Sequence, residues 1–301
     1  MLNVYEQVDR NKKKSAIIMV LFVVFVTVFA WLMAQAFGYN LSLVGIALIL
    51  AGMTSFAGYW WSDKIILKIS KARLAQREKD FLFFTVAENL ALAAQIPKPK
   101  LYVIDDSAPN AFATGRDPDH AVICATTGLL QKLDRTELEG VIAHEISHVR
   151  NFDIRLMSVV TVLVGMVTLL ADWFLRGTVF QKRSRSKNSG QLGAILLVLG
   201  VVLAILSPLI ANLIKLALSR RRELLADASA VKLTRFPDGL ARALEKIAVD
   251  KEPLEAANKA TAHLYISNPL KNHHDSIGWF AGLFNTHPPV EERVQALRQM
   301  S

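Results

Sequence analysis

The chain has 301 residues, of which 52% are hydrophobic, and a formal net charge of +9. This hydrophobic share is too high for an ordinary soluble domain, and it is concentrated in four runs. Lys and Arg lie beside those runs, as expected for residues that orient a membrane protein, so we expect no nucleic-acid partner. Cys124 is the only cysteine, which excludes an intrachain disulfide and favours a reducing compartment for the active-site region.

Two uncharged segments follow a basic N-terminal stretch. Residues 15–62 carry no charged side chain, and Gly38 to Asn40 divide them into segments 15–37 and 41–61. Each segment is long enough to span the hydrocarbon of a bilayer as a helix. The sequence therefore predicts a transmembrane hairpin.

The first segment also fits a cleaved signal peptide, because a basic start, an apolar run and Ala34-Gln35-Ala36 match that template. The run is longer than a usual signal sequence and a second span follows at once, which favours a retained anchor. Under either interpretation, the positions of the basic residues put residue 64 onward on the cytoplasmic side.

Residues 63–155 have the pattern of a soluble domain. A helix is predicted from Phe81 to Gln95, followed by short strands at 101–104, 110–114 and 121–125. We expect these strands to form a small antiparallel sheet. Its edge strand can hydrogen-bond to an extended substrate and fix the scissile bond without recognising side chains. A plain core strand is the alternative. The candidate substrate-binding residues are Asn110, Ala111, Phe112 and Ala113.

The segment from His144 to His148 has the sequence His-Glu-Ile-Ser-His. On a helix it places two imidazoles one turn apart on one face, with the Glu145 carboxylate offset by about 100°. Two nitrogen ligands from one rigid element, with a base beside the open coordination position, are what a hydrolytic zinc site needs. A capping box of Asp134 and Glu137 predicts that a helix of about four turns begins after Asp134 and contains the motif.

Two further apolar runs follow the motif, at 156–171 and 192–211. The first covers only about 24 Å as a helix, which is short for a span. The loop 172–191 between them is basic, so two spans would put it on the outer face against the positive-inside tendency. We predict two spans, with a pair that only dips into the membrane and a buried core pair as alternatives.

A third metal ligand is expected beyond this second hairpin. Glu223 and Asp227 lie four residues apart on one face of a predicted helix. A Glu oxygen would complete a site with two His ligands and leave the fourth position to water. Asp227 could accept the outer N–H of a ligating histidine and so fix its tautomer. Ala226 and Ala230 are small enough to let two helices approach closely, and a salt bridge is the alternative for Glu223.

Together these motifs resemble the HtpX-type integral-membrane zinc metalloproteases of the gluzincin class, relatives of the CAAX prenyl endopeptidases. The resemblance covers nearly the whole chain and includes a short terminal helix with Arg293. The N-terminal extension before the first span departs from the family pattern. Further matching segments are Ile96-Pro97-Lys98-Pro99, Asn110 to Gly115, Asn151-Phe152-Asp153 and Thr286-His287-Pro288-Pro289.

The resemblance implies a membrane-bound endopeptidase with one Zn²⁺ per subunit. Its expected substrates are damaged or misassembled membrane proteins, cleaved at the cytoplasmic face of the inner membrane. His144, His148 and Glu223 match the metal ligands of the family, and Glu145 matches its general base.

Two more positions complete the predicted site. Asp153 follows the motif. Like Asp227, it is a candidate for a carboxylate that hydrogen-bonds to a metal ligand and orients it. His287 is the candidate donor to the oxyanion, with capping or a purely structural role as the alternative.

The expected fold is a predominantly α-helical membrane protein with four apolar helices and a cytoplasmic zincin-like α+β catalytic domain. Alternative functions are a catalytically silent membrane scaffold and a CAAX-type processing endopeptidase. An intramembrane protease is disfavoured because polar residues flank the motif, and a zinc transporter because the four runs lack His, Asp and Glu. The predicted divisions are 1–62 (tail and first hairpin), 63–155 (first catalytic part), 156–214 (second hairpin) and 215–301 (second catalytic part).

Overall fold

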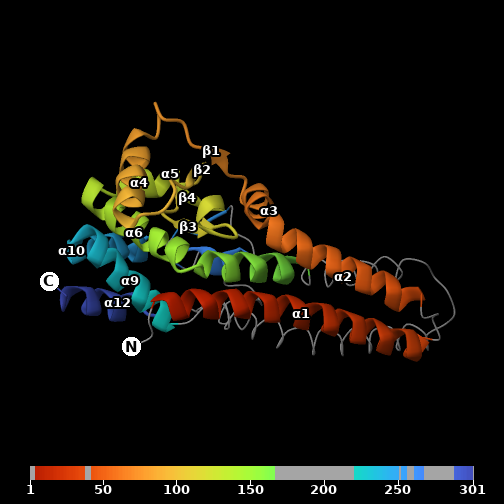
Figure 1. Ribbon diagram of the computed structural model, residues 1–301. Coiled ribbons are helices and arrows are strands. Elements are labelled where there is room, and N and C mark those ends of the chain that lie inside the picture. The colour runs from red at the N-terminus through yellow and green to blue at the C-terminus, as the bar shows by residue number, and fades with distance from the viewer. Residues whose placement is uncertain are drawn as a thin grey trace.

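The protein is described by a computed structural model that covers residues 4–37, 42–166, 220–250, 252–255, 261–267 and 288–300. Most of the second hairpin and His287 lie outside these residues. The described chain is predominantly helical, as predicted. Figure 1 shows a rounded part that holds the strands, from which α1 (Val4–Phe37) and α2 (Ser42–Trp60) extend together.

The N-terminal helices differ in detail from the predicted hairpin. α1 begins at Val4, so the basic residues before Ser15 form its first turns. α2 ends at Trp60, and α3 (Ser62–Ile69) follows after a bend of 86°. Among the described residues, α2 and α3 together have the length and composition of a membrane span, whereas no single helix does. The four spanning helices therefore stay a prediction.

The sheet is mixed, so the prediction of an antiparallel sheet is wrong. Its order is β1-β2-β4-β3. β2 and β4 are parallel, while β1 pairs with β2 and β3 pairs with β4 in antiparallel fashion. The loop 105–110 carries the chain past one strand position, which leaves room for β4 between β2 and β3. The strands are β1 (Arg73–Leu74), which the sequence analysis did not predict, β2 (Lys100–Ile104), β3 (Ala111–Thr114) and β4 (Val122–Thr126).

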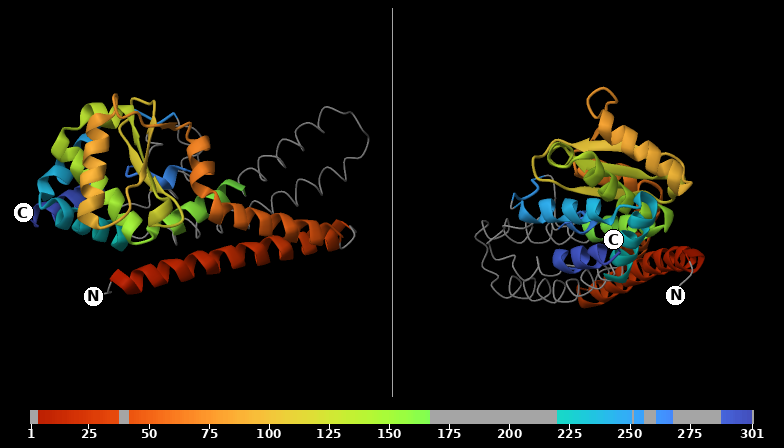
Figure 2. Two further views of the ribbon diagram at one scale, coloured as in Figure 1. Left: turned by 45° about the horizontal axis from the view of Figure 1, so that its top comes forward. Right: turned by 90° about the vertical axis from the view of Figure 1, so that its left-hand side faces the viewer.

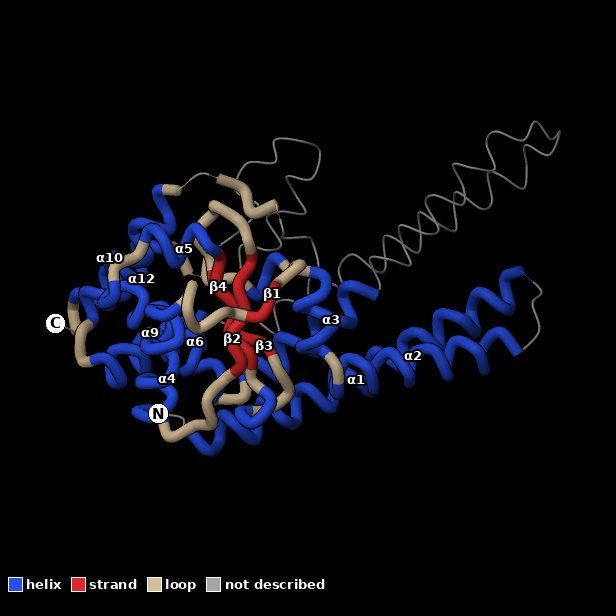
Figure 3. Tube along the Cα trace, turned by 90° about the horizontal axis from the view of Figure 1, so that it is seen from above, coloured by secondary structure: helices blue, strands red, loops and turns tan. Residues whose placement is uncertain are grey.

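The strands occupy the middle of the rounded part, with α3 on one side and α4 (Phe81–Ala94) and α6 (Arg135–Arg150) on the other (Figure 3). Along β3, Ala111 and Ala113 belong to the core that includes α4 and α6, whereas Phe112 belongs to a second core that includes α1. This alternation is the normal two-residue period of a strand. β3 therefore connects the catalytic helices to the first hairpin.

α6 begins with the predicted capping box, in which Asp134 and Glu137 each bond to the other's backbone. It contacts β3, α4, α9 (Arg220–Thr234) and α10 (Pro237–Val249). Its Gly140 is required by the close approach of α10, because an added Cβ would lie 2.7 Å from backbone atoms of Leu240. The remaining short elements are α5 (Thr127–Lys132), η1 (Pro118–His120) and η2 (Ala262–Leu264).

The last described helix, α12 (Val290–Arg298), contacts α9 and α10. Two further views show that the N-terminal end of α1 and the C-terminal end of α12 lie at the same end of the molecule (Figure 2). Segments from both ends of the sequence therefore reach the surroundings of α6.

Candidate metal centre

α6 presents its two histidines to the interior. His144 and His148 are buried, and their rings lie 4.8 Å apart between centroids at nearly a right angle. The two Nε2 atoms are 3.2 Å apart. Helical spacing of four residues thus brings two imidazole nitrogens to one point, as the sequence predicts.

Glu223 of α9 reaches the same point. Its Oε2 lies 3.5 Å from His144 Nε2, and its Oε1 lies 3.6 Å from His148 Nε2. This approach is possible because Ala226 and Ala230 of α9 are fully buried where the helices pack. The small size of both alanines predicted this close approach from the sequence.

The spacing of these three side chains fits a metal ion better than it fits hydrogen bonds. Ligand atoms about 2.0–2.1 Å from a tetrahedral ion lie roughly 3.3–3.4 Å from one another. The two Nε2 atoms are 3.2 Å apart, and each lies 3.5 or 3.6 Å from a different oxygen of Glu223, so these distances are close to that value. Good N–H···O bonds are shorter, at about 2.7–3.2 Å. Two histidines and one glutamate leave the fourth position for water or substrate, so the donor set matches a catalytic zinc site.

A carboxylate holds the outer nitrogen of each histidine. Asp227 Oδ1 lies 2.8 Å from His144 Nδ1, and Asp153 Oδ2 lies 3.1 Å from His148 Nδ1. A carboxylate in this position accepts the Nδ1–H bond, which leaves the lone pair on Nε2. Both histidines are therefore oriented with their ligating nitrogens toward Glu223.

Arg293 of α12 is an additional member of the centre. Its Nε and Nη2 atoms donate to the two oxygens of Asp227 at 2.8 and 2.7 Å, and its Nη2 lies 3.4 Å from His144 Nδ1. Both side chains are 1% exposed, so this bidentate pair is shielded from water. From the sequence, Arg293 was predicted only to lie in a short terminal helix, with no role at the metal centre. Its position beside Val294 on the buried face of that helix was the available signal.

Burial and these contacts have opposite effects on the titrating groups of the metal-free centre. Burial alone would lower the pKa of His144, but Asp227 and Glu223 outweigh it and raise that pKa to about 9. Burial would likewise lower the pKa of His148, but the hydrogen bond to Asp153 outweighs burial and raises that pKa. For Asp227, burial would raise the pKa, but Arg293 and His144 lower it to about 2. The Asp227 carboxylate is thus charged. Each imidazole holds its proton strongly, and a metal must displace that proton in order to bind.

The candidate general base, Glu145, is on the same helix as the histidines and is 3% exposed. Its charge contributes to the raised pKa of Arg293, after the larger contributions of Asp227 and Glu223. Glu145 therefore lies within the electrostatic reach of the centre. The candidate oxyanion donor, His287, lies outside the described residues.

The candidate substrate strand, β3, is an edge strand whose first half is already covered. Ile266 N–H donates to Ala111 C=O at 3.0 Å, and the Asn110 side chain donates to Ser267 C=O at 3.0 Å. Ala113 shares the outward direction of Ala111, because alternate residues of an edge strand face away from its neighbour. No described residue forms a hydrogen bond with the outward N–H and C=O of Ala113. The side chain of Phe112, another candidate substrate-binding residue, packs edge-to-face on Tyr265.

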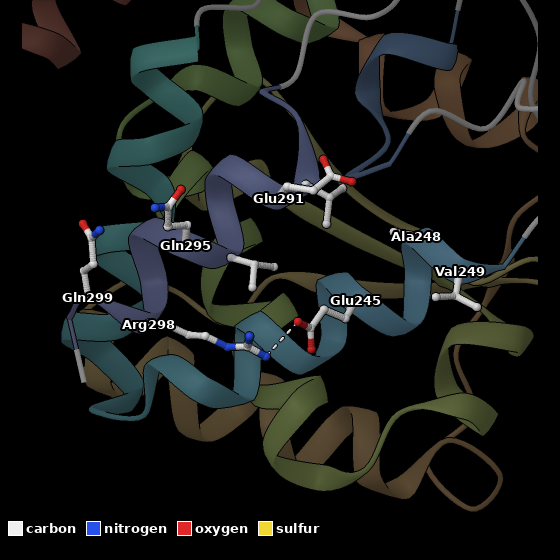
Figure 4. A pocket seen from close by; sticks show the side chains of 9 residues that line it. Glu245, Ala248, Val249, Glu291, Gln295, Arg298 and Gln299 are labelled. Carbon is white, nitrogen blue, oxygen red and sulfur yellow. Dashed lines mark hydrogen bonds and ion pairs between the residues drawn. The ribbon is translucent and has the colours of Figure 1, made fainter.

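A groove of about 550 Å³ lies between α10 and α12, and Figure 4 shows the side chains that line it. Arg298 and Glu245 form an ion pair of 2.7 Å across it. None of its lining residues belongs to the histidine cluster. The groove is therefore separate from the metal centre.

Two helices that bring a histidine pair and a glutamate to one buried point, beside a glutamate that can act as base, define a metallopeptidase of the His-Glu-x-x-His class. The model of peptidase family M48 matches residues 83–301. A "Protease HtpX homolog" from Dictyoglomus thermophilum is 46% identical over 298 residues, which are 98% of this chain and 94% of that protein. One from Caldanaerobacter subterraneus is 43% identical over 300 residues, which are 99% and 98% of the two chains.

The chain therefore belongs to peptidase family M48, and it is a zinc metalloprotease that acts on protein substrates. The fold is also similar to a crystal structure of Ste24p from S. mikatae, with a TM-score of 0.50 and 18% sequence identity. That match covers 97% of this chain and 67% of the other.

Proposed function

We propose that this metalloprotease is integral to the inner cell membrane, with several spans, and cleaves misfolded or damaged membrane proteins at the cytoplasmic face. The observation that carries the proposal is that a buried metal centre packs against helices whose apolar side chains are exposed. Such a surface is unusual for a soluble protein and would be covered by lipid tails. Exposed large apolar side chains of these helices include Ile17, Val20 and Leu21 of α1 and Ile46, Ile49, Leu50, Met53 and Phe56 of α2.

Each residue of the metal centre has a role in this proposal. His144, His148 and Glu223 would hold one Zn²⁺, while Asp227 and Asp153 orient the two imidazoles. Zinc held there would supply Lewis-acid chemistry, lowering the pKa of a bound water toward neutrality and polarising the scissile carbonyl. The Glu145 carboxylate takes that proton as the water attacks and then passes it to the leaving amine.

Substrate binding is proposed to occur through the backbone of β3. The outward N–H and C=O of Ala113 are placed to pair with an extended substrate segment. Binding of this kind depends on an exposed, extended backbone in the substrate and not on the identity of its side chains. The preference for particular substrate sequences is therefore weak. Asn110 and Ala111, whose polar groups bond to residues 266–267, support the strand instead of contacting the substrate. His287 remains the proposed oxyanion donor.

The proposal keeps the predicted division of the chain. Residues 63–155 and 215–301 form the catalytic unit, whereas 1–62 and 156–214 contribute the two hydrophobic hairpins. Because the hydrophobic hairpins adjoin the catalytic unit, its site would meet the loops and unfolded ends of membrane proteins first.

The test is cleavage of a membrane-anchored reporter by the full chain in zinc-loaded proteoliposomes. The reporter carries one cytoplasmic loop in two versions, one folded and one made extended by a destabilising substitution. We expect faster cleavage of the extended version and no cleavage by Glu145→Gln, which keeps the zinc ligands. Equal rates for the two loops, or equal activity of wild type and E145Q, would contradict the proposal. The second result would favour a catalytically silent scaffold.

A further inference from the structure

The turn after α6 holds the carboxylate that orients His148. Asn151 caps the helix, Phe152 adopts a φ of +58°, and helical geometry resumes at Asp153. A left-handed conformation is unfavourable for a residue with a bulky side chain. This conformation swings Asp153 back so that its Oδ2 lies 3.1 Å from His148 Nδ1. The turn therefore needs contacts that hold it in this shape.

Those contacts come from the start of α1, about 140 residues earlier in the chain. The Asn11 amide group donates to Asn151 C=O at 2.9 Å and to Asp153 Oδ1 at 2.8 Å. Asn11 is 4% exposed, although the neighbouring Lys12 and Lys13 are exposed. Both partners are acceptors, so the side chain must present its NH₂ group to them. One amide thus joins the two ends of the turn.

Further contacts keep α1 against this turn. Lys12 Nζ lies 4.6 Å from the centroid of the Phe152 ring. Ile18 and Phe22 of α1 belong to the same core as Leu156 and Val160, and Figure 1 shows α1 beside the helical residues 153–166. Because Lys12, Ile18 and Phe22 also hold α1 against this region, the position of Asn11 is fixed by more than its own two hydrogen bonds.

The chemistry of an amide suits this position. Asp153 has one oxygen toward His148 and the other toward Asn11, so both of its oxygens have defined partners. Asn11 supplies a neutral donor to this carboxylate, in addition to the positive charge of a nearby arginine. Arg222 of α9 also approaches Asp153 Oδ1, at 3.5 Å, which is too long for a strong hydrogen bond. Asn11 therefore makes the shorter contact to this oxygen.

We propose that Asn11 is a positioning residue for the zinc site, acting through Asp153 on His148. The first turns of α1 are then part of the metal centre as well as part of a hydrophobic hairpin. This inference rests on the proposed metal ligands. It also requires that the start of α1 lie on the same side of the membrane as the catalytic unit.

The test is a double-mutant cycle on the full chain in detergent, with zinc affinity measured by competition with a chelator. The variants are Asn11→Ala, Asp153→Ala and the combination of both. Lys13→Ala is the control, because it removes an exposed side chain from the same turns of α1. We expect N11A to weaken zinc binding by about tenfold, the lower end of the effect of losing a group that orients a ligand. K13A should stay within about twofold of wild type.

The cycle separates positioning from a merely structural role. If Asn11 acts through Asp153, adding N11A to D153A should change the zinc affinity by less than about twofold. An equal loss of affinity in both backgrounds would show that Asn11 only anchors α1, and unchanged affinity of N11A itself would also overturn the inference. Thermal unfolding of the metal-free variants checks that each one folds. Failure of the wild type to bind zinc would instead refute the proposed metal site.

Discussion

Asp227 has three polar contacts inside the protein, two from Arg293 and one from His144. A charge in this environment is tolerated only while its partners are present. Arg293 therefore stabilises the fold and also fixes the carboxylate that orients a ligand. This coupling means that a change in α12 reaches the metal through two side chains.

Replacing Arg293 with Ala should lower stability strongly, by about 3–5 kcal/mol, because the Asp227 carboxylate is left buried without its partner. Thermal unfolding of the metal-free protein measures this loss. Arg298→Ala is the control on the same helix, since its pair with Glu245 is exposed and is expected to contribute about 1 kcal/mol or less. Similar unfolding temperatures for R293A and R298A would contradict this account of the centre.

Zinc binding should depend on pH through His144. Its pKa of about 9 in the metal-free protein means that the ring is protonated at pH 7, and the metal must displace that proton. The apparent zinc affinity should therefore rise by at least about tenfold per pH unit between pH 6 and 8, and level off above about 9. Chelator competition across this range measures it, and a pH-independent affinity would be evidence against the His144–Asp227 contact.

The same shift has the opposite consequence for the stability of the metal-free fold. A pKa raised above about 6.5 contributes stability that is fully present below pH 6.5. That contribution is lost as the pH rises through about 9. High pH thus favours the metal-bound protein and weakens the metal-free one.

The ligands could be predicted from the sequence because residues four apart on a helix share a face whatever the tertiary structure. That rule fixed the relation of His144 to His148 and of Glu223 to Asp227. Arg293 and Asn11 could not be found in this way, because their partners are distant in sequence and no local spacing connects them.

At the scale of elements, α6 depends on its close packing with α10. Gly140→Ala should lower stability by about 1–3 kcal/mol, because the added methyl group would push the helices apart at Leu240. The His144–His148 motif lies one turn after Gly140 in α6. The same displacement would therefore move the ligands, and zinc affinity should fall as well. Gly52→Ala in α2 is the matched control, since its Cβ would meet nothing within 4 Å. Equal stability of G140A and G52A would show that this contact does not constrain α6.

Local patterns predicted the helices and strands better than they predicted which elements pack or pair with one another. The capping box of Asp134 and Glu137 located the start of α6. Strand order could not be predicted, because each short apolar strand can pair with any other and only the route of loop 105–110 decides. The parallel pairing of β2 and β4 is therefore a property of the whole sheet.

At the scale of the whole molecule, the centre is assembled from four separated parts of the chain. α1 holds the turn at residues 151–153, α6 and α9 supply the ligands, and α12 fixes one orienting carboxylate. α1, which contacts this centre through Asn11, also carries exposed apolar side chains, as does α2. This connection supports the proposal that the substrates are met at the bilayer surface.

We propose that Glu223 joins His144 and His148 around one zinc ion. The decisive measurement is the zinc content of the purified full chain in detergent, compared among wild type, Glu223→Ala and the exposed control Glu292→Ala. We predict about one zinc per chain in wild type and E292A. E223A should retain little zinc after dialysis. Full zinc content in E223A would contradict the claim.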